Sequence, residues 1–445
     1  MLEYYHILLE MKDVRTWIEI DRKALHHNVE QFFRLIPKET QFMAVIKSNA
    51  YGHGLAQVAK LLAEFRISNL ESRKKAPNSK FQIPNSRLWF GVDSIVEALR
   101  LRREAIANPI LVLGFTLPLR MAEAAKDDIT LCIANFESLS TLADLNEKPA
   151  FHLKVDTGMH RQGFQTHELP KLISLLKKNR LAPSGLFTHF ASAKDVCFPT
   201  YTCVQLEEFY TAIKQFEKAG YTDFIRHAAA SGGTLLFPQS HLQMVRVGMG
   251  MYGYWPSQEA KMHCSLPAKL KIKNEKVNPV REPARGIEPS TRIEPPDVAA
   301  SHGTLSNGVK VFELKPVLTW KTIISEVKDI PKGSYVGYDF TERVHRKTKI
   351  AVLPIGYWHG YDRGLSSIGD VLVRSVRARV LGRISMDMIV VDVTNAPEAQ
   401  VGDEVVLIGK QGKEEIWADE LAKKIGTSPY EFLTRINPLI RRVIV

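Results

Sequence analysis

Residues able to do chemistry follow several short apolar runs in this 445-residue chain. They are two lysines, an aspartate, a histidine, a small-residue triplet, an arginine and a glycine: Lys47, Lys154, Asp156, His189, Ser231, Gly232, Gly233, Arg246 and Gly248. The set contains neither a carboxylate pair nor a cluster with metal-ligand spacing, and the four cysteines form no CxxC pair. We therefore expect no metal site, and the chemistry that remains is that of a lysine amine.

Lys47 is the candidate nucleophile. A lysine amine condenses with a carbonyl group, and pyridoxal phosphate offers both an aldehyde and a phosphate to such a site. The segment NAYGHG, residues 49–54, follows Lys47 directly, and its glycines allow the backbone to approach a ligand closely. A lone lysine at a strand end is usually a solvated cation, so the assignment depends on these glycines and on the small residues that suit a phosphate.

The elements that must position these residues are short apolar runs that alternate with amphipathic segments. The runs cover residues 41–46, 88–92, 110–114, 130–134, 151–155, 184–190, 223–229 and 243–248. Helical periodicity is clear between them, as in residues 54–65, 94–105, 168–179 and 204–220. The alternation predicts a parallel (β/α)₈ TIM-type barrel, whose active site lies at the carboxyl ends of its strands and often holds a phosphate after strands 7 and 8. A doubly wound open sheet is the alternative, but no GxGxxG follows the first run.

From Pro316 onward the pattern changes to strands separated by Gly, Asp and Pro turns, closed by a helix around residues 416–426. The chain is thus predicted to be an α/β protein with a cofactor-binding barrel over residues 22–257 and a mostly β domain over residues 311–445. Residues 14–21 read as a strand that joins this second domain.

Two segments fit neither predicted domain. Residues 66–87 interrupt the barrel, and residues 258–310, rich in Pro, Ser, Glu and Arg, separate the domains. We expect both to protrude as mobile insertions, and a binding role for either stays open. Residues 1–13 read as an N-terminal extension, in which Met1 or Met11 is the functional start.

The composition is that of an ordinary globular protein, 45% hydrophobic and 24% charged. The formal net charge of +12 suggests nucleic-acid binding until it is located, because the two insertions carry +5 and +3 of it. No basic stripe interleaved with aromatic residues is left elsewhere. No run approaches the roughly 20 apolar residues that span a bilayer, and acids interrupt the apolar N-terminus. We therefore expect a cytoplasmic protein with neither a nucleic-acid nor a membrane partner.

Nine segments resemble, in chain order, the successive motifs of bacterial alanine racemases. They are AVIKSNAYGHG, HLKVDTGMHRQGF, FTHFASA, HAAASGG, VRVGMGMYG, YVGYDF, PIGYWHGYDRG, GRISMDM and TRINPLIRR. The resemblance runs from about Thr16 to the C-terminus, apart from the two insertions. It implies a pyridoxal-phosphate-dependent enzyme that interconverts L- and D-alanine and supplies D-alanine for the peptidoglycan of the cell wall. It also implies a head-to-tail homodimer whose active sites are shared across the interface.

The resemblance assigns roles to individual residues. Lys47 matches the lysine that holds pyridoxal phosphate and acts as one catalytic base, and Tyr338 matches the second base, contributed by the other subunit. Arg161 and the backbone of Met386 match the groups that hold the substrate carboxylate, while Tyr357 is expected to shape the substrate entrance. The remaining cofactor contacts are matched by Tyr51, His189, Ser231, Arg246, Gly248 and Met249.

Within this set, Arg246 matches the partner of the pyridine nitrogen, with His189 and His227 behind it. Lys154 matches a lysine that is carbamylated in some members, which would place an anion opposite Arg161. Asp156 is expected to be a structural hydrogen-bond acceptor.

The expected chemistry agrees with these assignments. Racemisation removes the α proton from one face of the substrate and returns a proton to the other face, so it needs bases on opposite sides. An arginine stays protonated and donates to the pyridine nitrogen, which keeps that nitrogen unprotonated and makes the cofactor a weaker electron sink. Tyr338 must lose its proton to act as a base, so a nearby cation is expected, and Arg383 is a candidate.

The chain departs from the family pattern at three places. The usual GYxDG reads GYWHG, with His359 in place of an aspartate, and THFA is followed by Lys194 before the acid at Asp195. A phosphate-contacting tyrosine found near the C-terminus of some members has no clear match in TRINPLIRRVIV. The rival interpretations are a serine or broad-specificity racemase of the same fold, a related decarboxylase, which Arg246 disfavours, and an inactive cofactor-binding or interaction protein.

Overall fold

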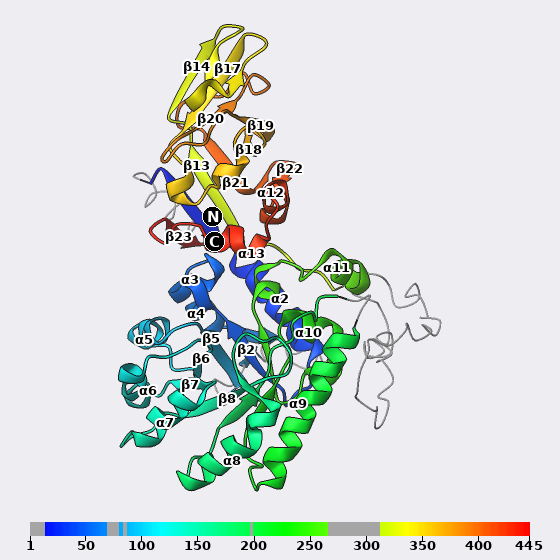
Figure 1. Ribbon diagram of the computed structural model, residues 1–445. Coiled ribbons are helices and arrows are strands. Elements are labelled where there is room, and N and C mark those ends of the chain that lie inside the picture. Colours follow the sequence, from blue (N-terminus) through cyan, green and yellow to red (C-terminus); the bar gives the residue numbers. More distant parts are fainter. Residues whose placement is uncertain (1–13, 69–79, 83–86, 196–198, 266–311) are drawn as a thin grey trace.

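The computed structural model describes residues 14–68, 80–82, 87–195, 199–265 and 312–445, which form two bodies joined end to end (Figure 1). The predicted extension and most of both predicted insertions lie outside these residues. Within them, we find no helix that is both long enough and apolar enough to cross a membrane.

The larger body is the predicted barrel. Its parallel strands are β2 (Gln41–Val45), β5 (Leu88–Val92), β6 (Ile110–Val112), β7 (Thr130–Ile133), β8 (Phe151–Asp156), β10 (Gly185–Phe187), β11 (Ile225–His227) and β12 (Met244–Val247). They pair in the order β11-β10-β8-β7-β6-β5-β2-β12, and short β9 (Phe164–Gln165) extends β8. The ring closes where Gln243 N donates to Arg226 O at 3.1 Å and Arg246 N donates to Ala229 O at 2.9 Å. The prediction of a (β/α)₈ barrel is therefore confirmed.

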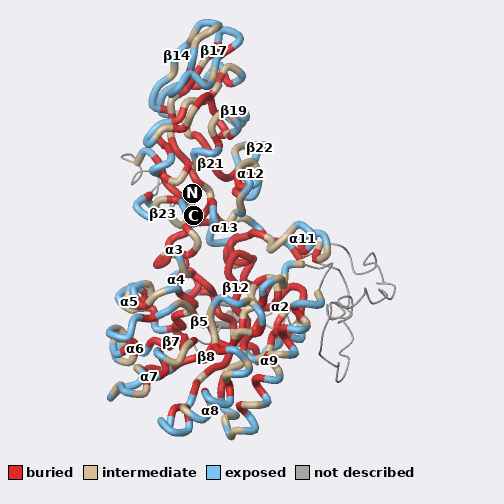
Figure 2. Tube along the Cα trace, viewed as in Figure 1, coloured by how far each residue is buried: buried red, intermediate tan, exposed pale blue. Residues whose placement is uncertain are grey.

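Helices cover the outside of this barrel (Figure 1). They are α2 (Arg22–Leu35), α4 (Leu55–Ala63), α5 (Ile95–Arg103), α6 (Met121–Lys126), α7 (Phe136–Asp144), α8 (Leu169–Lys178), α9 (Thr200–Lys218) and α10 (Ser231–Leu236). Each turns an apolar stripe inward, as α5 does with Ile95, Ala98 and Leu101. The buried residues accordingly gather between the helices and the sheet (Figure 2).

The second body is the predicted β domain, which the N-terminal strand joins. Its main sheet has the order β14-β17-β20-β19-β18-β21-β13-β1-β23, with β22 added beside β21. The strands are β1 (Thr16–Ile20), β13 (Leu318–Ile323), β14 (Glu326–Ile330), β17 (Thr348–Leu353), β18 (Asp370–Val373), β19 (Val376–Leu381), β20 (Ile389–Asp392), β21 (Glu404–Gln411), β22 (Glu414–Ile416) and β23 (Arg441–Ile444). A separate hairpin pairs β15 (Tyr335–Val336) with β16 (Glu342–Arg343), and the helices are α12 (Ala418–Lys424) and α13 (Pro429–Thr434).

The two bodies are fastened together beside the first barrel strand. Helix α13 packs on the short helix α3 (Lys47–Tyr51), and an added Cβ at Gly52 would lie 2.2 Å from Leu433 O. Arg442, which is 8% exposed, donates from Nε and Nη2 to Gly52 O at 3.1 and 2.9 Å. The loop that carries Lys47 is thus held in place by the second domain.

The segments predicted as insertions are more ordered at their ends than expected. Residues Arg66–Ser68 (β3) and Lys80–Gln82 (β4) pair as an antiparallel hairpin, and Gln258–Ser265 form helix α11. The ends of both segments therefore form regular elements, while their protrusion and mobility stay predictions. Residues 69–79, 83–86 and 266–311 lie outside the described part of the chain.

Candidate active site

The Lys47 loop is a tight left-handed turn at the carboxyl end of β2. Ser48, Asn49, Ala50 and Tyr51 have φ values of 55°, 55°, 53° and 51°. Such values are unfavourable for residues with a Cβ and persist only where the surroundings enforce them. Glu97 stabilises this turn with both carboxylate oxygens, which accept hydrogen bonds from Asn49 N at 3.1 Å and from Asp93 N at 2.9 Å. Lys47 Nζ lies 3.7 Å from Asp93 Oδ1, a carboxylate that the sequence analysis did not single out.

A small polar cradle lies after β11 and β12, the seventh and eighth strands of the barrel. Ser231 Oγ accepts from Gly248 N at 3.1 Å and from Gly250 N at 3.4 Å. An added Cβ at Gly248 would lie only 2.9 Å from the hydroxyl of Tyr51. Gly248 therefore leaves room for the Tyr51 phenol beside the Ser231 hydroxyl, and both hydroxyl groups can donate to a phosphate.

Tyr51 is the link between the Lys47 loop and this cradle. Burial raises the pKa of Tyr51, and the charges of Tyr430 and Asp93 add to the effect, so the phenol keeps its proton and can donate to an anion. Tyr430 on α13 packs edge-on against it, with ring centroids 6.4 Å apart. The sequence analysis found no C-terminal tyrosine in TRINPLIRRVIV, but Tyr430, just before that segment, reaches the cradle wall.

Arg246 projects from β12 into the barrel and is 3% exposed. Its Nη2 donates to Thr188 O at 2.7 Å and to Ala228 O at 2.9 Å, and its Nη1 donates to His227 Nδ1 at 2.8 Å. Burial lowers the pKa of Arg246 to about 9, which leaves the guanidinium charged at neutral pH. His189 lies 3.4 Å from Nη2, and burial together with the Arg246 charge lowers its pKa to about 3. The arginine is thus a charged donor among neutral imidazoles.

These features fit pyridoxal phosphate. Lys47 offers an amine for its aldehyde, and the open cradle at Gly248 and Ser231 suits its phosphate. Arg246 can only donate, which matches a pyridine nitrogen that accepts. The residues predicted for the cofactor, Lys47, Tyr51, His189, Ser231, Arg246, Gly248 and Met249, all lie at the carboxyl ends of β2, β10, β11 and β12.

Lys154 lies on β8, and Arg161 lies in the segment that follows this strand. Lys154 is 6% exposed, and its Nζ donates to Gln162 Oε1 at 3.2 Å. Burial lowers the pKa of Lys154, and the charges of Arg161 and Arg246 contribute. Asp156 is the structural acceptor that we expected. Its Oδ1 binds the amides of Gly158, Met159 and His160, and its Oδ2 binds that of Arg161.

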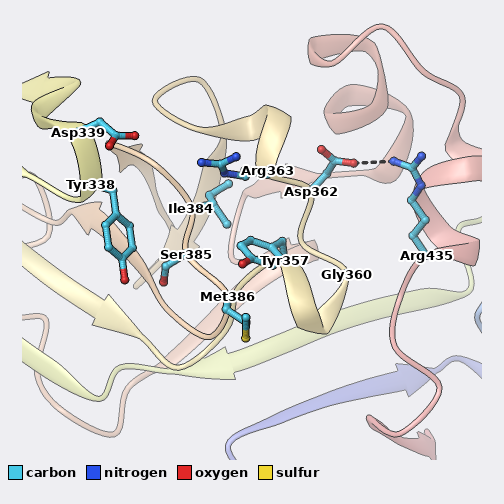
Figure 3. A pocket seen from close by; sticks show the side chains of 10 residues that line it. All are labelled: Tyr338, Asp339, Tyr357, Gly360, Asp362, Arg363, Ile384, Ser385, Met386 and Arg435. Atoms are coloured by element: carbon cyan, nitrogen blue, oxygen red, sulfur yellow. Dashed lines mark hydrogen bonds and ion pairs between the residues drawn. The ribbon is translucent and has the colours of Figure 1, made fainter.

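A second group of predicted residues lies apart from Lys47, in a pocket of about 900 Å³ on the β domain (Figure 3). The pocket is lined by Tyr338, Asp339, Tyr357, Gly360, Asp362, Arg363, Ile384, Ser385, Met386 and Arg435. Every lining residue comes from this domain and none from the barrel. Tyr338 and Met386 are 66% and 54% exposed. These residues therefore face outward from the β domain, and none of the contacts among the described residues joins Tyr338 or Met386 to Lys47 of the same chain.

Tyr338 is held by an unusual turn. It lies between Gly337, at φ 77°, and Asp339, at φ 62°. Arg383, the cation expected beside Tyr338, pairs through Nε with Asp339 Oδ2 at 2.7 Å. The arginine thus pairs with the residue that follows Tyr338, and its charge is shared with that carboxylate.

His359 does not line this pocket. It is 7% exposed, and its Nδ1 accepts from Gly356 N at 3.2 Å. Burial lowers the pKa of His359, so it is a neutral acceptor within its turn. The histidine in GYWHG therefore supports the turn between Tyr357 and Gly360.

Comparison with known proteins agrees with this geometry. Residues 20–70 and 85–256 match the family model "Alanine racemase, N-terminal domain", and residues 317–444 match "Alanine racemase, C-terminal domain". The alanine racemase of Leptospira interrogans serovar Lai is 35% identical over 98% of this chain and 97% of its own length. That of Desulfosudis oleivorans is 34% identical over 97% of both chains.

Solved structures give the same result. The alanine racemase of Bacillus anthracis with bound L-Ala-P superposes with a TM-score of 0.77 at 29% identity, covering 97% of this chain and 95% of that one. An alanine racemase of Clostridium difficile 630 in complex with cycloserine gives a TM-score of 0.73 at 27% identity, covering 97% and 96%. Family models that match both domains, together with relatives that align over nearly the whole length, show that this chain belongs to the alanine racemase family.

Proposed function

We propose that this enzyme interconverts L- and D-alanine with pyridoxal phosphate as cofactor and two bases from different subunits. The observation that carries the proposal is the division of the site. Lys47, the cradle and Arg246 lie at the barrel mouth, whereas Tyr338 and Met386 line an outward-facing pocket of the β domain. A head-to-tail dimer would bring the two halves together.

The exposed surface supports such a dimer. The side chains around the pocket include large apolar groups that face solvent in one chain: Tyr335, Tyr338, Phe340, Trp358, Met386 and Met388, each at least 53% exposed. The segment after β6 also exposes Phe115, Leu117 and Leu119 at 54%, 58% and 95%. Exposed apolar side chains that gather in a patch mark protein–protein interfaces. We infer that a second copy covers it.

Each residue then has a task in the reaction. When bound, pyridoxal phosphate supplies the aldehyde that captures the substrate amine and the conjugated ring that accepts electrons from the α-carbon. Arg161 and the backbone of Met386 bind the substrate carboxylate. Lys47 exchanges a proton with the α-carbon on one face, and Tyr338 of the partner subunit does so on the other. Arg246 donates to the pyridine nitrogen throughout and limits electron withdrawal by the ring.

Lys154 is proposed to carry a carbamate. Its lowered pKa favours the neutral amine, whose nitrogen bonds to CO₂ while a proton leaves to solvent. The product is an anion that can face Arg161 and orient it toward the substrate carboxylate. Intact-protein mass spectrometry should show the added mass of one CO₂, which Lys154→Ala should abolish.

Mixing two inactive variants tests the shared site. A Lys47→Ala chain lacks the lysine and a Tyr338→Phe chain lacks the phenol, so neither homodimer has a complete site. A mixed dimer contains one complete site and one doubly defective site, so random mixing should restore about a quarter of the wild-type activity. No recovery in dimers shown to be mixed would contradict sharing.

Proton exchange and substrate breadth test the rest. In D₂O, Tyr338→Phe should lose α-proton exchange selectively for one antipode of alanine, and equal loss for both would argue against two bases. A panel of L-amino acids separates alanine from serine racemisation, and release of CO₂ would indicate a decarboxylase. Binding of pyridoxal phosphate without turnover would indicate an inactive binding protein. Rescue of a D-alanine auxotroph would support a role in peptidoglycan supply.

A further inference from the structure

Behind Arg246 a chain of two histidines continues into the closed interior of the barrel. Arg246 Nη1 lies 2.8 Å from His227 Nδ1, and His227 Nε2 lies 2.9 Å from His152 Nδ1. Both imidazoles are fully buried. The sequence analysis did not select His152. None of its contacts with the described residues reaches the cradle or Lys47.

The direction of each hydrogen bond in this chain follows from the arginine. A guanidinium has only donors, so His227 Nδ1 must accept. Burial, with the charge of Arg246, lowers the pKa of both histidines, that of His152 to about 3, so both rings are neutral. A neutral His227 that accepts at Nδ1 carries its proton on Nε2 and donates to His152 Nδ1. His152 must then accept at Nδ1 and carry its own proton on Nε2.

Packing fixes both rings in the planes that these bonds need. Phe187 stacks on His227 with ring centroids 4.7 Å apart and 9° between the planes. His152 lies against Gly185 of the neighbouring strand, where an added Cβ would be only 2.4 Å from the imidazole Cγ. Gly185 therefore provides the space that His152 occupies, and neither ring can turn over without displacing a neighbour.

The far end of the chain agrees with this order. His152 Nε2 is buried and, among the described residues, has no hydrogen-bond partner; the same holds for Nε1 of Trp89. The two rings are neighbours, with centroids 5.6 Å apart. An indole N–H only donates, so it could bond to an accepting Nε2 but not to a donating one. Two neighbouring donors that do not bond to each other are compatible with a protonated Nε2.

We propose that His152 is a positioning residue for Arg246, which it supports by accepting a hydrogen bond from His227 Nε2 and so holding the His227 ring with Nδ1 toward the guanidinium. Without that acceptor, the Nε2–H of His227 would be buried without a partner, which is costly. The ring could then turn away from Arg246, and the guanidinium would lose one fixed partner. The consequence for catalysis rests on the proposed function, in which Arg246 faces the pyridine nitrogen, but the tautomer order itself does not.

Two substitutions at the same position separate acceptance from bulk. Asparagine can place Oδ1 near the position of Nδ1 and still accept from His227, whereas leucine cannot accept at all. His152→Leu should therefore leave the Nε2–H of His227 without an acceptor and free the ring, and His152→Asn should keep the ring in place. Gly185→Ala offers an independent perturbation, because it displaces the imidazole and leaves every member of the chain chemically intact.

The first measurement is ¹⁵N NMR of the cofactor-free protein, labelled at histidine. The wild type should show an unprotonated Nδ1 and a protonated Nε2 on both His227 and His152, and His152→Asn should leave the His227 pattern unchanged. A protonated Nδ1 on wild-type His227 would overturn the proposal without any variant, so failure of His152→Leu to fold would not protect it. In that variant the Nε2–H signal of His227 should lose the shift of a hydrogen-bonded N–H, and if the variant folds with this signal unchanged, the proposal is also wrong.

The second measurement uses the protein loaded with pyridoxal phosphate. His152→Leu should shift the visible absorbance of the bound cofactor and lower kcat about tenfold with little change in KM, while His152→Asn should stay within about twofold of wild type. A confirmed tautomer order with unchanged absorbance and kcat in His152→Leu would overturn the positioning role of His152, whereas wild-type protein that binds pyridoxal phosphate without racemising alanine would refute the proposed function alone. A changed His227 pattern in His152→Asn would also overturn the positioning role.

Discussion

Substitution of Gly248 by alanine tests the phosphate cradle directly. The new Cβ would lie 2.9 Å from the Tyr51 hydroxyl and 3.3 Å from its Cζ, both closer than side chains normally approach. Tyr51 is pinned from the other side by Tyr430 and Tyr252, whose ring centroids are 6.4 and 5.5 Å away. The phenol must therefore move out of the cradle or the backbone amide of residue 248 must retreat. The first change removes the phenol that we propose as a donor to the phosphate, and the second disturbs the amide that holds Ser231 Oγ.

The size of the effect follows from the kind of bond that is lost. A hydrogen bond to a charged group contributes about 1.5–3 kcal/mol. Loss of one such bond should raise the dissociation constant for pyridoxal phosphate by about 10- to 150-fold. Absorbance titration of the cofactor-free protein measures this constant. Pyridoxal, which has the aldehyde but no phosphate, is the matched ligand control, and its affinity for Gly248→Ala should be nearly unchanged.

Tyr51→Phe provides the matched variant. It removes the same hydroxyl without adding bulk, so it should weaken pyridoxal phosphate binding by a similar factor. Because both substitutions act on one contact, the double variant should be no weaker than about the worse single variant. Equal losses for pyridoxal and pyridoxal phosphate, or additive effects in the double variant, would show that the cradle does not hold the phosphate.

Three further perturbations have defined outcomes. Arg442→Met should remove both hydrogen bonds to Gly52 O and lower the free energy of unfolding by about 2–4 kcal/mol, as measured by denaturant unfolding. Proteolysis near the Lys47 loop should become faster. Unchanged stability would contradict the idea that Arg442 holds this loop in place. Asp156→Ala should free four backbone amides of the loop that carries Arg161, and it should therefore raise KM for alanine more than it lowers kcat. A loss of kcat with unchanged KM would contradict the role of Asp156 in holding Arg161. His53 and His152 have pKa values lowered to about 3 by burial, so below about pH 6.5 the unfolded chain takes up protons that the folded chain refuses. Stability should then fall by about 1.4 kcal/mol per pH unit for each histidine between about pH 6.5 and pH 3, which thermal unfolding at pH 7 and pH 5 can check.

The sequence was sufficient to predict the barrel because its strands are buried on both faces. Each apolar run was bounded by turn residues and lay between amphipathic helices, so Leu88–Val92 was located to the residue. The secondary structure at the ends of the two insertions was not predicted, because it is not visible in the local pattern. The β3–β4 hairpin depends on pairing between residues separated by a long polar segment, which local periodicity does not report.

The candidate site divides in the same way. Lys47, Ser231 and Arg246 were found because a strand end fixes their position within the barrel. Tyr430 and His152 were not found, since their roles depend on contacts between distant elements. Tyr430 reaches the cradle only because α13 packs on α3, and His152 acquires a partner only because β8 and β11 lie on either side of β10. The local sequence pattern does not predict such contacts between distant elements.

The bond between Arg442 and Gly52 spans 390 positions of the chain. A ribosome therefore completes residues 47–52 long before it makes the residue that secures them. Until Arg442 and α13 emerge, the left-handed turn at Ser48–Tyr51 has the support of Glu97 but lacks its contacts with the second domain, and a nascent barrel should hold its reactive amine less firmly. Capture of the cofactor is thus expected to be among the last events of biosynthesis, so that only fully translated chains become active.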